Sequence, residues 1–392
     1  MLQATASFFC ALVVLIMQTP AKQIVTAGPA PVGPYSPAIK AGGLIYVSGT
    51  LAQEAGGAIA GKGDVGAQTR RVLERMREIL TAAGSSLDRA VSVTVYLTSA
   101  EHFAAMNDAY RTFWPSDPPT RTTVIADLVL PDALVEMSMI AVPAGVERTV
   151  IHPPGWMKSP NPYSYAIRAG DTVFLSGLVS RNGRDNTIVP GDVTAQTRTV
   201  LDNAGELLKA AGLTHANVVS SRVYLPDAAT FARMNEAYRA YFPSAPPARA
   251  TVRAGLAGSQ YSVEITMIAS TAAREVISDG RAANPNLSPA IRAGGRIYVS
   301  GVLGVTPENR TDAAAQTRET LNRIRKTLAA AGCTPGDVVD GLVYLRDLTD
   351  YASMNSVYRG VFEKGFPART TVGTGLVAPD GLVEIMVTAV KP

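Results

Sequence analysis

Three arginine–glutamate pairs are the residues of this 392-residue sequence with the clearest capacity for chemistry. A guanidinium offers a planar fork of donors that binds a carboxylate in bidentate fashion, and a glutamate can hold a water or exchange a proton with a substrate. We therefore predict a site for a small acid, and the alternative is a buried ion pair that only fixes sheet register. In each pair the glutamate follows the arginine by fifteen residues: Arg121 and Glu136, Arg249 and Glu264, and Arg369 and Glu384.

Each arginine is expected to open a β-strand, because it follows a proline segment and is followed two positions later by Thr123, Thr251 or Thr371. Period two then places the arginine and the threonine on one face of the strand. Fifteen residues are enough for two adjacent antiparallel strands and their hairpin, so we expect the two members of a pair to meet. The arginine should also keep the pKa of the glutamate low, which would leave a carboxylate able to accept a proton from water.

Other chemistries find less support. Gly56 to Lys62 imitates a phosphate-binding loop, but Gly63 replaces the hydroxyl residue that would hold magnesium. Two cysteines and three histidines do not cluster with metal-ligand spacing, so we predict no metal. A formal net charge of +4 is too dilute for a nucleic-acid surface, while 47% hydrophobic and 17% charged residues are typical of a globular chain with large cores.

Internal repeats organise the whole chain. Four short motifs each occur three times, at offsets of 128 and 120 residues. We therefore predict three tandem copies, over residues 22–146, 147–272 and 273–392. The third copy has four residues fewer after its Ser-Gly pair, a deletion that we place in a surface loop. The motifs begin with Gln68-Thr69-Arg70, Ala82-Ala83-Gly84, Val95-Tyr96-Leu97 and Met106-Asn107 in the first copy.

Each copy is predicted to be an α+β domain of one mixed sheet and two helices. In the first copy, a strand over residues 44–47 precedes a helix that Asp64 caps and Gly84 ends. A second strand over residues 91–97, a second amphipathic helix and two more strands follow. In the last strand Val135, Met137 and Met139 alternate with other residues, which puts Glu136 on the opposite face. Asp192 and Asp312 are the matching helix caps.

Three near-equal copies with short linkers favour a closed ring over beads on a string. A ring of this kind resembles a homotrimer whose protomers have been fused, because closed symmetry leaves no binding patch of any unit unpaired.

The constellation of motifs resembles the RidA (YjgF) family, the reactive-intermediate deaminases. The resemblance covers nearly all of residues 23–391, three times over. It rests on five motifs in order: Gly-Pro-Tyr at 33–35, Ser-Gly at 48–49, the Ala-Gln helix start, the Met-Asn helix, and the Pro-x-Arg strand with Glu fifteen residues on.

This resemblance implies chorismate-mutase-like domains arranged as a pseudo-trimer within one monomeric chain, with ligand clefts between copies. It implies hydrolysis of 2-aminoacrylate or 2-iminopropanoate-type enamines and imines to 2-keto acids and ammonia, without cofactor or metal. The partner would be a small 2-imino or 2-keto acid. The alternative is a non-catalytic module that binds small carboxylates. Family members have also been described as endoribonucleases, which the charge of this chain does not support.

Carried over residue by residue, the resemblance assigns carboxylate binding to the three arginines and water positioning to the three glutamates. Further family positions are matched by a tyrosine, a serine, an asparagine and a threonine. They are Tyr35 and Tyr163; Ser48, Ser176 and Ser300; Asn107, Asn235 and Asn355; and Thr123, Thr251 and Thr371.

Two differences from the family pattern weaken the transfer of these residue roles to this sequence. Leu287 occupies the tyrosine position of the third copy, so one cleft should be altered. The threonines replace a cysteine common in the family, a mild change if only the backbone N–H meets the substrate. The tyrosines could instead be core aromatics, and the serines and asparagines could bond to backbone.

The N-terminus has two interpretations. Residues 8–17 form an apolar run of the length of a signal-peptide core, with small residues for cleavage after Ala21, so residues 1–21 are a possible export signal. Against this, no Lys or Arg precedes the run, and translation from Met17 would leave a cytoplasmic protein. The run is too short to span a bilayer as a helix, and no second one exists.

Overall fold

A computed structural model describes residues 22–28, 30–362 and 365–391. The possible signal segment at residues 1–21 therefore lies outside the described residues. Within the described ranges no helix combines the length and the apolar character that a bilayer crossing requires.

Each copy forms one mixed sheet and two α-helices, as predicted. The first copy contains β1 (Gln23–Val25), β2 (Ala38–Ala41), β3 (Leu44–Leu51), α1 (Val65–Ala82), β4 (Ala90–Leu97), α2 (Phe103–Arg111), β5 (Thr120–Ile125), β6 (Asp127–Leu128) and β7 (Val135–Ala141). The second contains β8 (Arg148–Ile151), β9 (Ala166–Ala169), β10 (Thr172–Leu175), α3 (Val193–Ala210), β11 (Val218–Leu225), α4 (Phe231–Arg239), β12 (Ala248–Arg253), β13 (Gly255–Leu256) and β14 (Glu264–Ser270). The third contains β15 (Arg274–Ile277), β16 (Ala290–Ala293), β17 (Arg296–Leu303), α5 (Ala313–Ala330), β18 (Val338–Leu345), α6 (Tyr351–Val361), β19 (Ala368–Gly373), β20 (Gly375–Leu376) and β21 (Val383–Val390).

Helix starts and ends follow the sequence signals. The side chains of Asp64, Asp192 and Asp312 each accept a hydrogen bond from the backbone N–H three residues on, at 2.8 to 2.9 Å. Such a cap satisfies an N–H group that the helix itself leaves free. Gly84 follows α1 with φ +73°, a left-handed conformation that glycine adopts without strain. The four residues missing from the third copy fall in the loop between β17 and α5, as predicted.

The glutamine of the repeated Gln-Thr-Arg motif fastens the first helix of each copy to the loop before its last strand. Gln68 donates to the carbonyl of Asp132 at 2.9 Å and accepts from the N–H of Leu134 at 2.8 Å. Gln196 and Gln316 make the matching pair of bonds in the other copies. Because Leu134 lies two residues before Glu136, this clamp also fixes the start of the strand that carries the glutamate.

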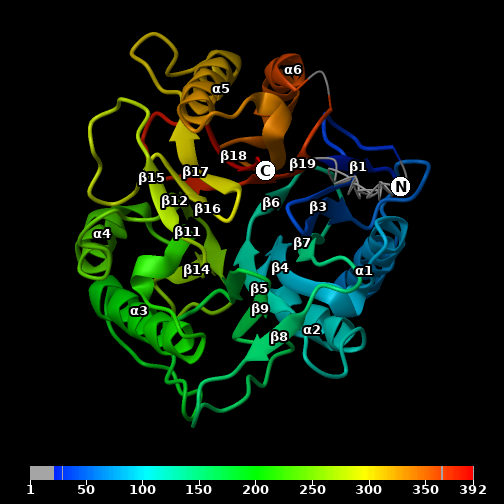
Figure 1. The fold of residues 1–392 in the computed structure, drawn as a ribbon. Helices are drawn as coiled ribbons and strands as arrows, with labels where there is room; N and C mark the ends of the chain where they lie inside the picture. The colour runs from blue at the N-terminus through cyan, green and yellow to red at the C-terminus, as the bar shows by residue number, and fades with distance from the viewer. Residues whose placement is uncertain (1–21, 29, 363–364, 392) are drawn as a thin grey trace, which may run out of the picture.

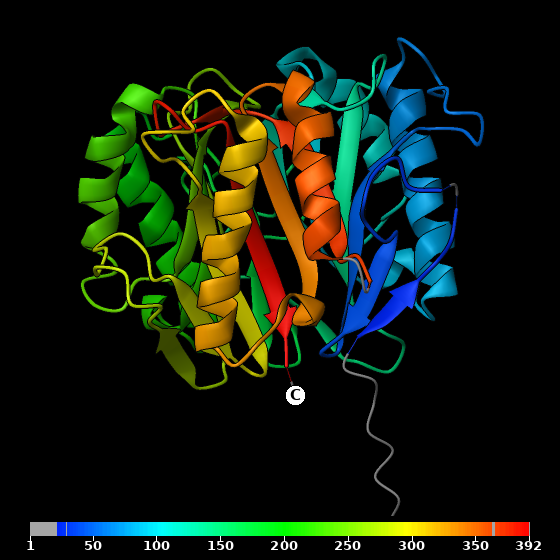
Figure 2. The same cartoon turned by 90° about the horizontal axis from the view of Figure 1, so that it is seen from above.

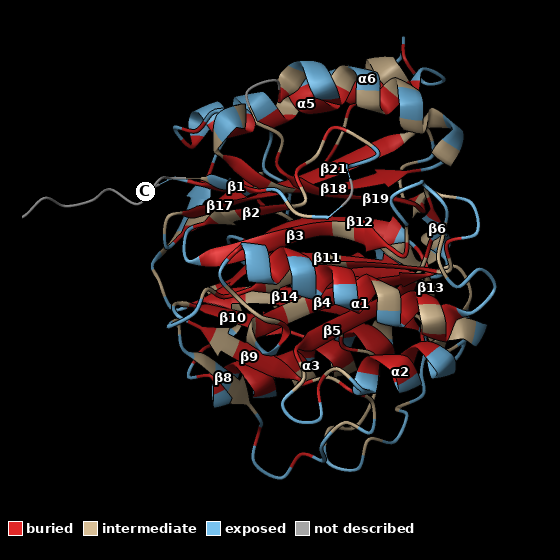
Figure 3. Cartoon of the chain, turned by 90° about the vertical axis from the view of Figure 1, so that its right-hand side faces the viewer, coloured by how far each residue is buried: buried red, intermediate tan, exposed pale blue. Residues whose placement is uncertain are grey.

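One face of each sheet packs against its two helices. In the first copy Val135, Met137 and Met139 share a buried core with Val72 and other residues of α1, which confirms the predicted alternation in β7. Figure 3 shows the strands buried and the outer helix faces exposed. Figure 2 shows α5 and α6 along the outside of the third sheet.

The three sheets close into a ring by exchanging short edge strands. β13 of the second copy pairs with β5 of the first, β20 of the third pairs with β12 of the second, and β6 of the first pairs with β19 of the third. Each sheet therefore has seven strands, one of them borrowed. Figure 1 shows the three helix pairs around this shared centre. The chain is thus an intrachain pseudo-trimer, as predicted.

The inner sheet faces form a common core along the pseudo-threefold axis. Tyr96, Tyr224 and Tyr344 occupy equivalent positions in it and are fully buried. At another level of the axis, Arg296 of the third copy forms an ion pair with Asp171 of the second at 2.8 Å and donates to the carbonyl of Gly42 of the first at 2.8 Å. This single guanidinium contacts all three copies.

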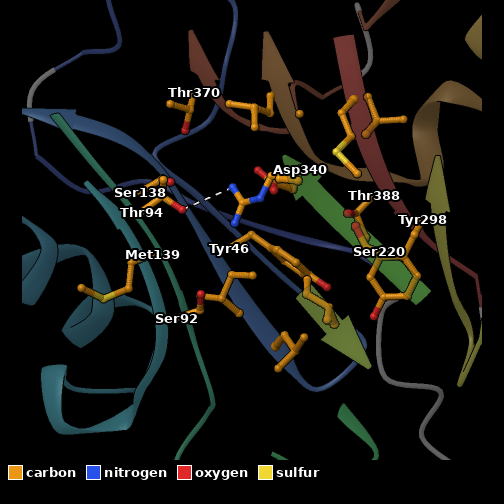
Figure 4. Close-up of a pocket in the computed structure, with 18 of the residues that line it drawn as sticks. Tyr46, Ser92, Thr94, Ser138, Met139, Ser220, Tyr298, Asp340, Thr370 and Thr388 are labelled. Carbon is orange, nitrogen blue, oxygen red and sulfur yellow. Dashed lines mark hydrogen bonds between the residues drawn. The ribbon is translucent and has the colours of Figure 1, made fainter. Parts of the chain in front are cut away.

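A cavity of about 80 Å³ lies on the axis and breaks the threefold symmetry (Figure 4). Arg222 stands there where the other copies have Thr94 and Leu342, and Asp340 stands where they have Ser92 and Ser220. Arg222 donates to the Thr94 hydroxyl at 3.3 Å. Burial raises the pKa of Asp340 to about 6, and Arg222 opposes that rise. The positive charge of Arg222 and the negative charge of Asp340 therefore lie in the wall of the same cavity.

Replacing either charge alone with the residue of another copy, Arg222→Leu or Asp340→Ser, should lower the free energy of unfolding by about 1 to 3 kcal/mol, because the remaining charge is left buried without its opposite. The double variant should recover most of that loss. Denaturant unfolding of the four proteins gives the comparison. A double variant whose loss equals the sum of the single losses would contradict the pairing.

Candidate active site

The arginine and the glutamate of one copy do not meet, so the predicted hairpin is wrong. In the first sheet β4 lies between β5 and β7. Arg121 is opposite Val93 of β4, whereas Glu136 is opposite Tyr96, three residues further along the same strand. Residues an odd number apart on a strand point to opposite faces. Arg121 and Glu136 therefore face opposite sides of their sheet.

The pairs form between copies instead. We name three clefts by the copies that supply the arginine and then the glutamate. Thr123, two residues after Arg121, donates its backbone N–H to Glu264 Oε1 at 3.4 Å in the 1–2 cleft, and Arg121, Thr123 and Glu264 line one cavity of about 110 Å³. Electrostatic coupling of Arg249 with Glu384 and of Arg369 with Glu136 marks the matching 2–3 and 3–1 clefts.

The three arginines are buried, with exposed fractions of 2 to 4%. Each guanidinium lies over the tyrosine ring of the second helix of its own copy: Arg121 over Tyr110 at 5.0 Å, Arg249 over Tyr238 at 4.6 Å and Arg369 over Tyr358 at 4.8 Å. These tyrosines stabilise the cation without neutralising it. Burial lowers the pKa of Arg121 and Arg249. The sequence signal for this tyrosine is its recurrence three residues after the asparagine, which our sequence analysis did not use.

The predicted serines join the arginine strand to the neighbouring copy. Ser176 Oγ accepts from the backbone N–H of Arg121 at 2.9 Å and donates to the carbonyl of Ser164 at 2.7 Å. Ser300 makes the same bridge to Arg249, and Ser48 makes it to Arg369. Each hydroxyl accepts from one backbone group and donates to another, so we assign the serines to positioning the arginines.

The glutamates are buried and their pKa values are high, contrary to the low values that we expected. Burial raises the pKa of Glu136, Glu264 and Glu384 to about 8 in each case, and the arginine of the neighbouring copy only partly opposes the rise. The desolvation of a carboxylate at 3 to 5% exposure therefore outweighs the attraction of a guanidinium that makes no ion pair with it. At neutral pH each carboxyl is mainly protonated.

A glycine makes room for each glutamate, a feature that the sequence analysis treated only as a landmark. A Cβ atom built on Gly177 would lie 1.9 Å from Glu264 Oε1. Gly49 and Gly301 stand in the same relation to Glu136 and Glu384. Any side chain here would displace the carboxyl, which explains why a glycine follows the serine in all three copies.

The remaining predicted residues are placed differently in the three clefts. Tyr163 lies 5.7 Å from Arg121 and Tyr35 lies 5.5 Å from Arg369, so the tyrosine comes from the copy that supplies the glutamate. Leu287 takes this position in the third copy. Asn235 accepts from Arg249 Nη2 at 2.7 Å, whereas Asn107 donates to Asn161 at 3.4 Å and Asn355 makes no matching bond to Arg369 within the described residues. The threonine hydroxyls of Thr123, Thr251 and Thr371 are buried without a described partner.

The 1–2 cleft keeps its guanidinium most available. Within the described chain, the Arg121 side chain makes no hydrogen bond, and its Nη1 is buried. In contrast, Arg249 is bonded to Asn235, and Arg369 Nη2 donates to the Tyr351 hydroxyl at 3.4 Å. A buried cation without an anionic partner is unfavourable unless a ligand supplies one. No group of three or more potential metal-ligating His, Cys, Asp or Glu side chains occurs among the described residues.

Fold and clefts together define a ring of three α+β domains with a cleft at each domain boundary. A family model described as Endoribonuclease L-PSP matches residues 25–143, 156–271 and 279–391. The chain belongs to this family, that of the RidA and YjgF proteins, and contains three tandem copies of its domain.

Individual relatives correspond to one copy each. A RutC family protein of Sulfurisphaera tokodaii is 42% identical over 113 residues, which are 29% of this chain and 90% of that protein. A RutC family protein of Pyrococcus abyssi is 42% identical over 113 residues, 29% of this chain and 89% of that protein. The crystal structure of the Rid family protein YyfA from Yersinia pestis matches with 29% identity and a TM-score of 0.31, over 32% of this chain and all of that protein.

The raised pKa of Glu264 predicts a stability effect. Its folded-state pKa of about 8 exceeds the ordinary value of 4.5, so the folded state holds a proton that the unfolded state releases, and stability falls as pH rises from 4.5 to 8. Glu264→Gln should therefore unfold at nearly the wild-type temperature at pH 4, where Glu264 is protonated in both states, and at a higher temperature than wild type at pH 9. Glu308→Gln, at an exposed glutamate, is the control. Equal shifts at both pH values would contradict a neutral Glu264.

Proposed function

We propose that this chain hydrolyses small 2-imino acids, of the 2-aminoacrylate and 2-iminopropanoate type, to 2-keto acids and ammonia in the 1–2 cleft. The observation that carries the proposal is a buried guanidinium without a counter-ion, Arg121, which lines the same cavity as a buried, neutral carboxyl, Glu264. Family membership supports the substrate class, since the resemblance implies imine deaminases.

Arg121 would bind the substrate carboxylate through two charge-assisted hydrogen bonds. The backbone around it is held by the Ser176 bridge, and its guanidinium lies 5.0 Å from the Tyr110 ring centroid and 5.7 Å from that of Tyr163. Fixing one end of the substrate directs the C=N carbon toward the Glu264 side of the cavity. Proximity and orientation then supply most of the acceleration, because imine hydrolysis is already rapid in water.

The neutral Glu264 would act first as an acid. It donates its proton to the imine nitrogen, or to the terminal carbon of an enamine, which gives an iminium and leaves a carboxylate. A water then adds to the iminium carbon and passes a proton to that carboxylate. The resulting carbinolamine releases ammonia when Glu264 carries a proton from its hydroxyl to the nitrogen. Glu264 thus ends in the state in which it began, and the water oxygen becomes the keto oxygen.

A non-catalytic carboxylate-binding role is the second candidate, and it is favoured for the 2–3 cleft. There Arg249 already bonds to Asn235 and Leu287 replaces the tyrosine. Binding of 2-ketobutyrate without turnover of any imine would favour this role for the whole protein. We further propose that one monomeric chain is sufficient, because each arginine shares its cleft with a glutamate of the same chain.

Arg121→Ala should lower kcat/KM for 2-iminopropanoate by about 100-fold or more, since each lost charge-assisted bond contributes roughly 1.5 to 3 kcal/mol. Arg249→Ala, with the same loss of charge in a cleft whose arginine is already bonded, should change it by less than about 3-fold. Imine is generated by an amino-acid oxidase and its decay is followed against the spontaneous rate. Wild-type turnover in an Arg121→Ala/Arg249→Ala/Arg369→Ala protein would rule out these clefts.

The pH dependence of kcat/KM should show a falling limb near pH 8, because Glu264 must be protonated to act first as an acid and its pKa is about 8. Glu264→Gln should lose the enzymatic rate over the whole range. The measurement is kcat/KM between pH 6 and 10 after subtraction of the uncatalysed decay. A rate that instead rises through pH 8 would assign the carboxylate as the initial base.

A further inference from the structure

A second arginine lines the cavity of the 1–2 cleft. Arg181 contributes to the same cavity wall as Arg121, Tyr163 and Glu264. Burial raises the pKa of Tyr163, whereas its hydrogen bond with Ser159 and the two guanidinium groups lower it, so Tyr163 lies within electrostatic reach of both arginines. The cavity of about 110 Å³ has room for a small molecule of several heavy atoms, because one water needs roughly 10 to 15 Å³.

Arg181 is held in place by residues that only the second copy possesses. Its Nε donates to the Tyr261 hydroxyl, its Nη1 donates to the carbonyl of Asn186 at 2.6 Å, and its guanidinium lies 5.6 Å from the Tyr261 ring centroid. In the first copy Gln53 stands in the place of Arg181, and Ala133 stands in the place of Tyr261. In the third, Gly381 replaces the tyrosine, and Val305 stands at the same distance from the Ser-Gly pair. An arginine at this loop position is therefore specific to the second copy.

Neither arginine is neutralised by the protein. None of the ion pairs in the described part of the chain involves Arg121 or Arg181. Arg181 Nη2 has no hydrogen-bond partner among the described residues, and the side chain is half-buried, so this group is free for a ligand. The one acid in the cavity wall, Glu264, is mainly protonated at neutral pH. The cleft thus has two positive charges and nearly no negative charge.

We propose that the 1–2 cleft selects 2-imino acids that carry a second carboxylate on the side chain, with Arg121 binding the first carboxylate and Arg181 the second. This inference rests on the proposed function and specifies its substrate class. Two cations with fixed donors favour a dianion over a monoanion, because a monoanion leaves one guanidinium to be solvated by the few waters of the cavity. The reaction remains imine hydrolysis, with Glu264 cycling its proton as described above. Arg181 is a specificity-determining residue in this scheme.

The test compares 2-iminosuccinate with 2-iminopropanoate, generated in place by oxidases acting on aspartate and alanine. Wild type should have the higher kcat/KM for 2-iminosuccinate. Arg181→Gln, which installs the residue of the first copy, should lower kcat/KM for 2-iminosuccinate by about 10- to 100-fold and leave that for 2-iminopropanoate within about 2-fold. Arg184→Gln removes the same charge from an exposed neighbour outside the cavity wall and should change neither.

An equal loss for both substrates in Arg181→Gln would show that Arg181 only supports the loop, and would overturn the inference while leaving the proposed function intact. Unchanged rates for both substrates in Arg121→Ala would instead overturn the proposed function. If wild type hydrolyses neither imine, calorimetric titration with oxaloacetate and pyruvate decides the charge preference. Wild type should then bind oxaloacetate more tightly and Arg181→Gln should bind the two alike, whereas equal binding by wild type would overturn the inference.

Discussion

A guanidinium buried at the boundary between two domains, without a carboxylate in contact, is the constraint on which the site depends. Such a group is unfavourable in a protein interior, and it is tolerated here because a tyrosine ring lies beneath it and a serine bridge fixes its backbone. Arg121 cannot be satisfied by its own sheet, since Glu136 lies on the opposite face. In the proposed function the substrate carboxylate supplies the anion for Arg121.

Ring closure makes this arrangement possible. Each sheet obtains its last strand from the next copy, so the sheet of each copy is completed only in the ring. The same exchange brings the arginine strand of one copy beside the Ser-Gly turn and the glutamate strand of the next. Closing the ring therefore also assembles the clefts. This explains why the residues at the boundaries between copies recur in all three copies.

Fusion of the copies into one chain permits them to diverge. A homotrimer repeats every substitution three times around its axis, so a single Arg222 facing a single Asp340 would be impossible there. The same freedom allows Leu287 in one cleft, the Asn235 bond to Arg249 in that cleft, and the Arg181–Tyr261 contact in another. Three clefts of common origin therefore differ in charge and in the availability of their arginine.

The sequence by itself determined the three copies, the α+β class, the aspartate helix caps and the face of β7 that bears Glu136, because these depend on periodicity and on contacts within a few residues. It did not determine which glutamate meets which arginine. A spacing of fifteen residues does not reveal that β4 inserts between the two strands, nor that the partner strand lies in another copy. It also gave the wrong direction for the pKa of Glu264, because desolvation depends on how deeply the closed ring buries the carboxyl, and only the tertiary structure sets that depth.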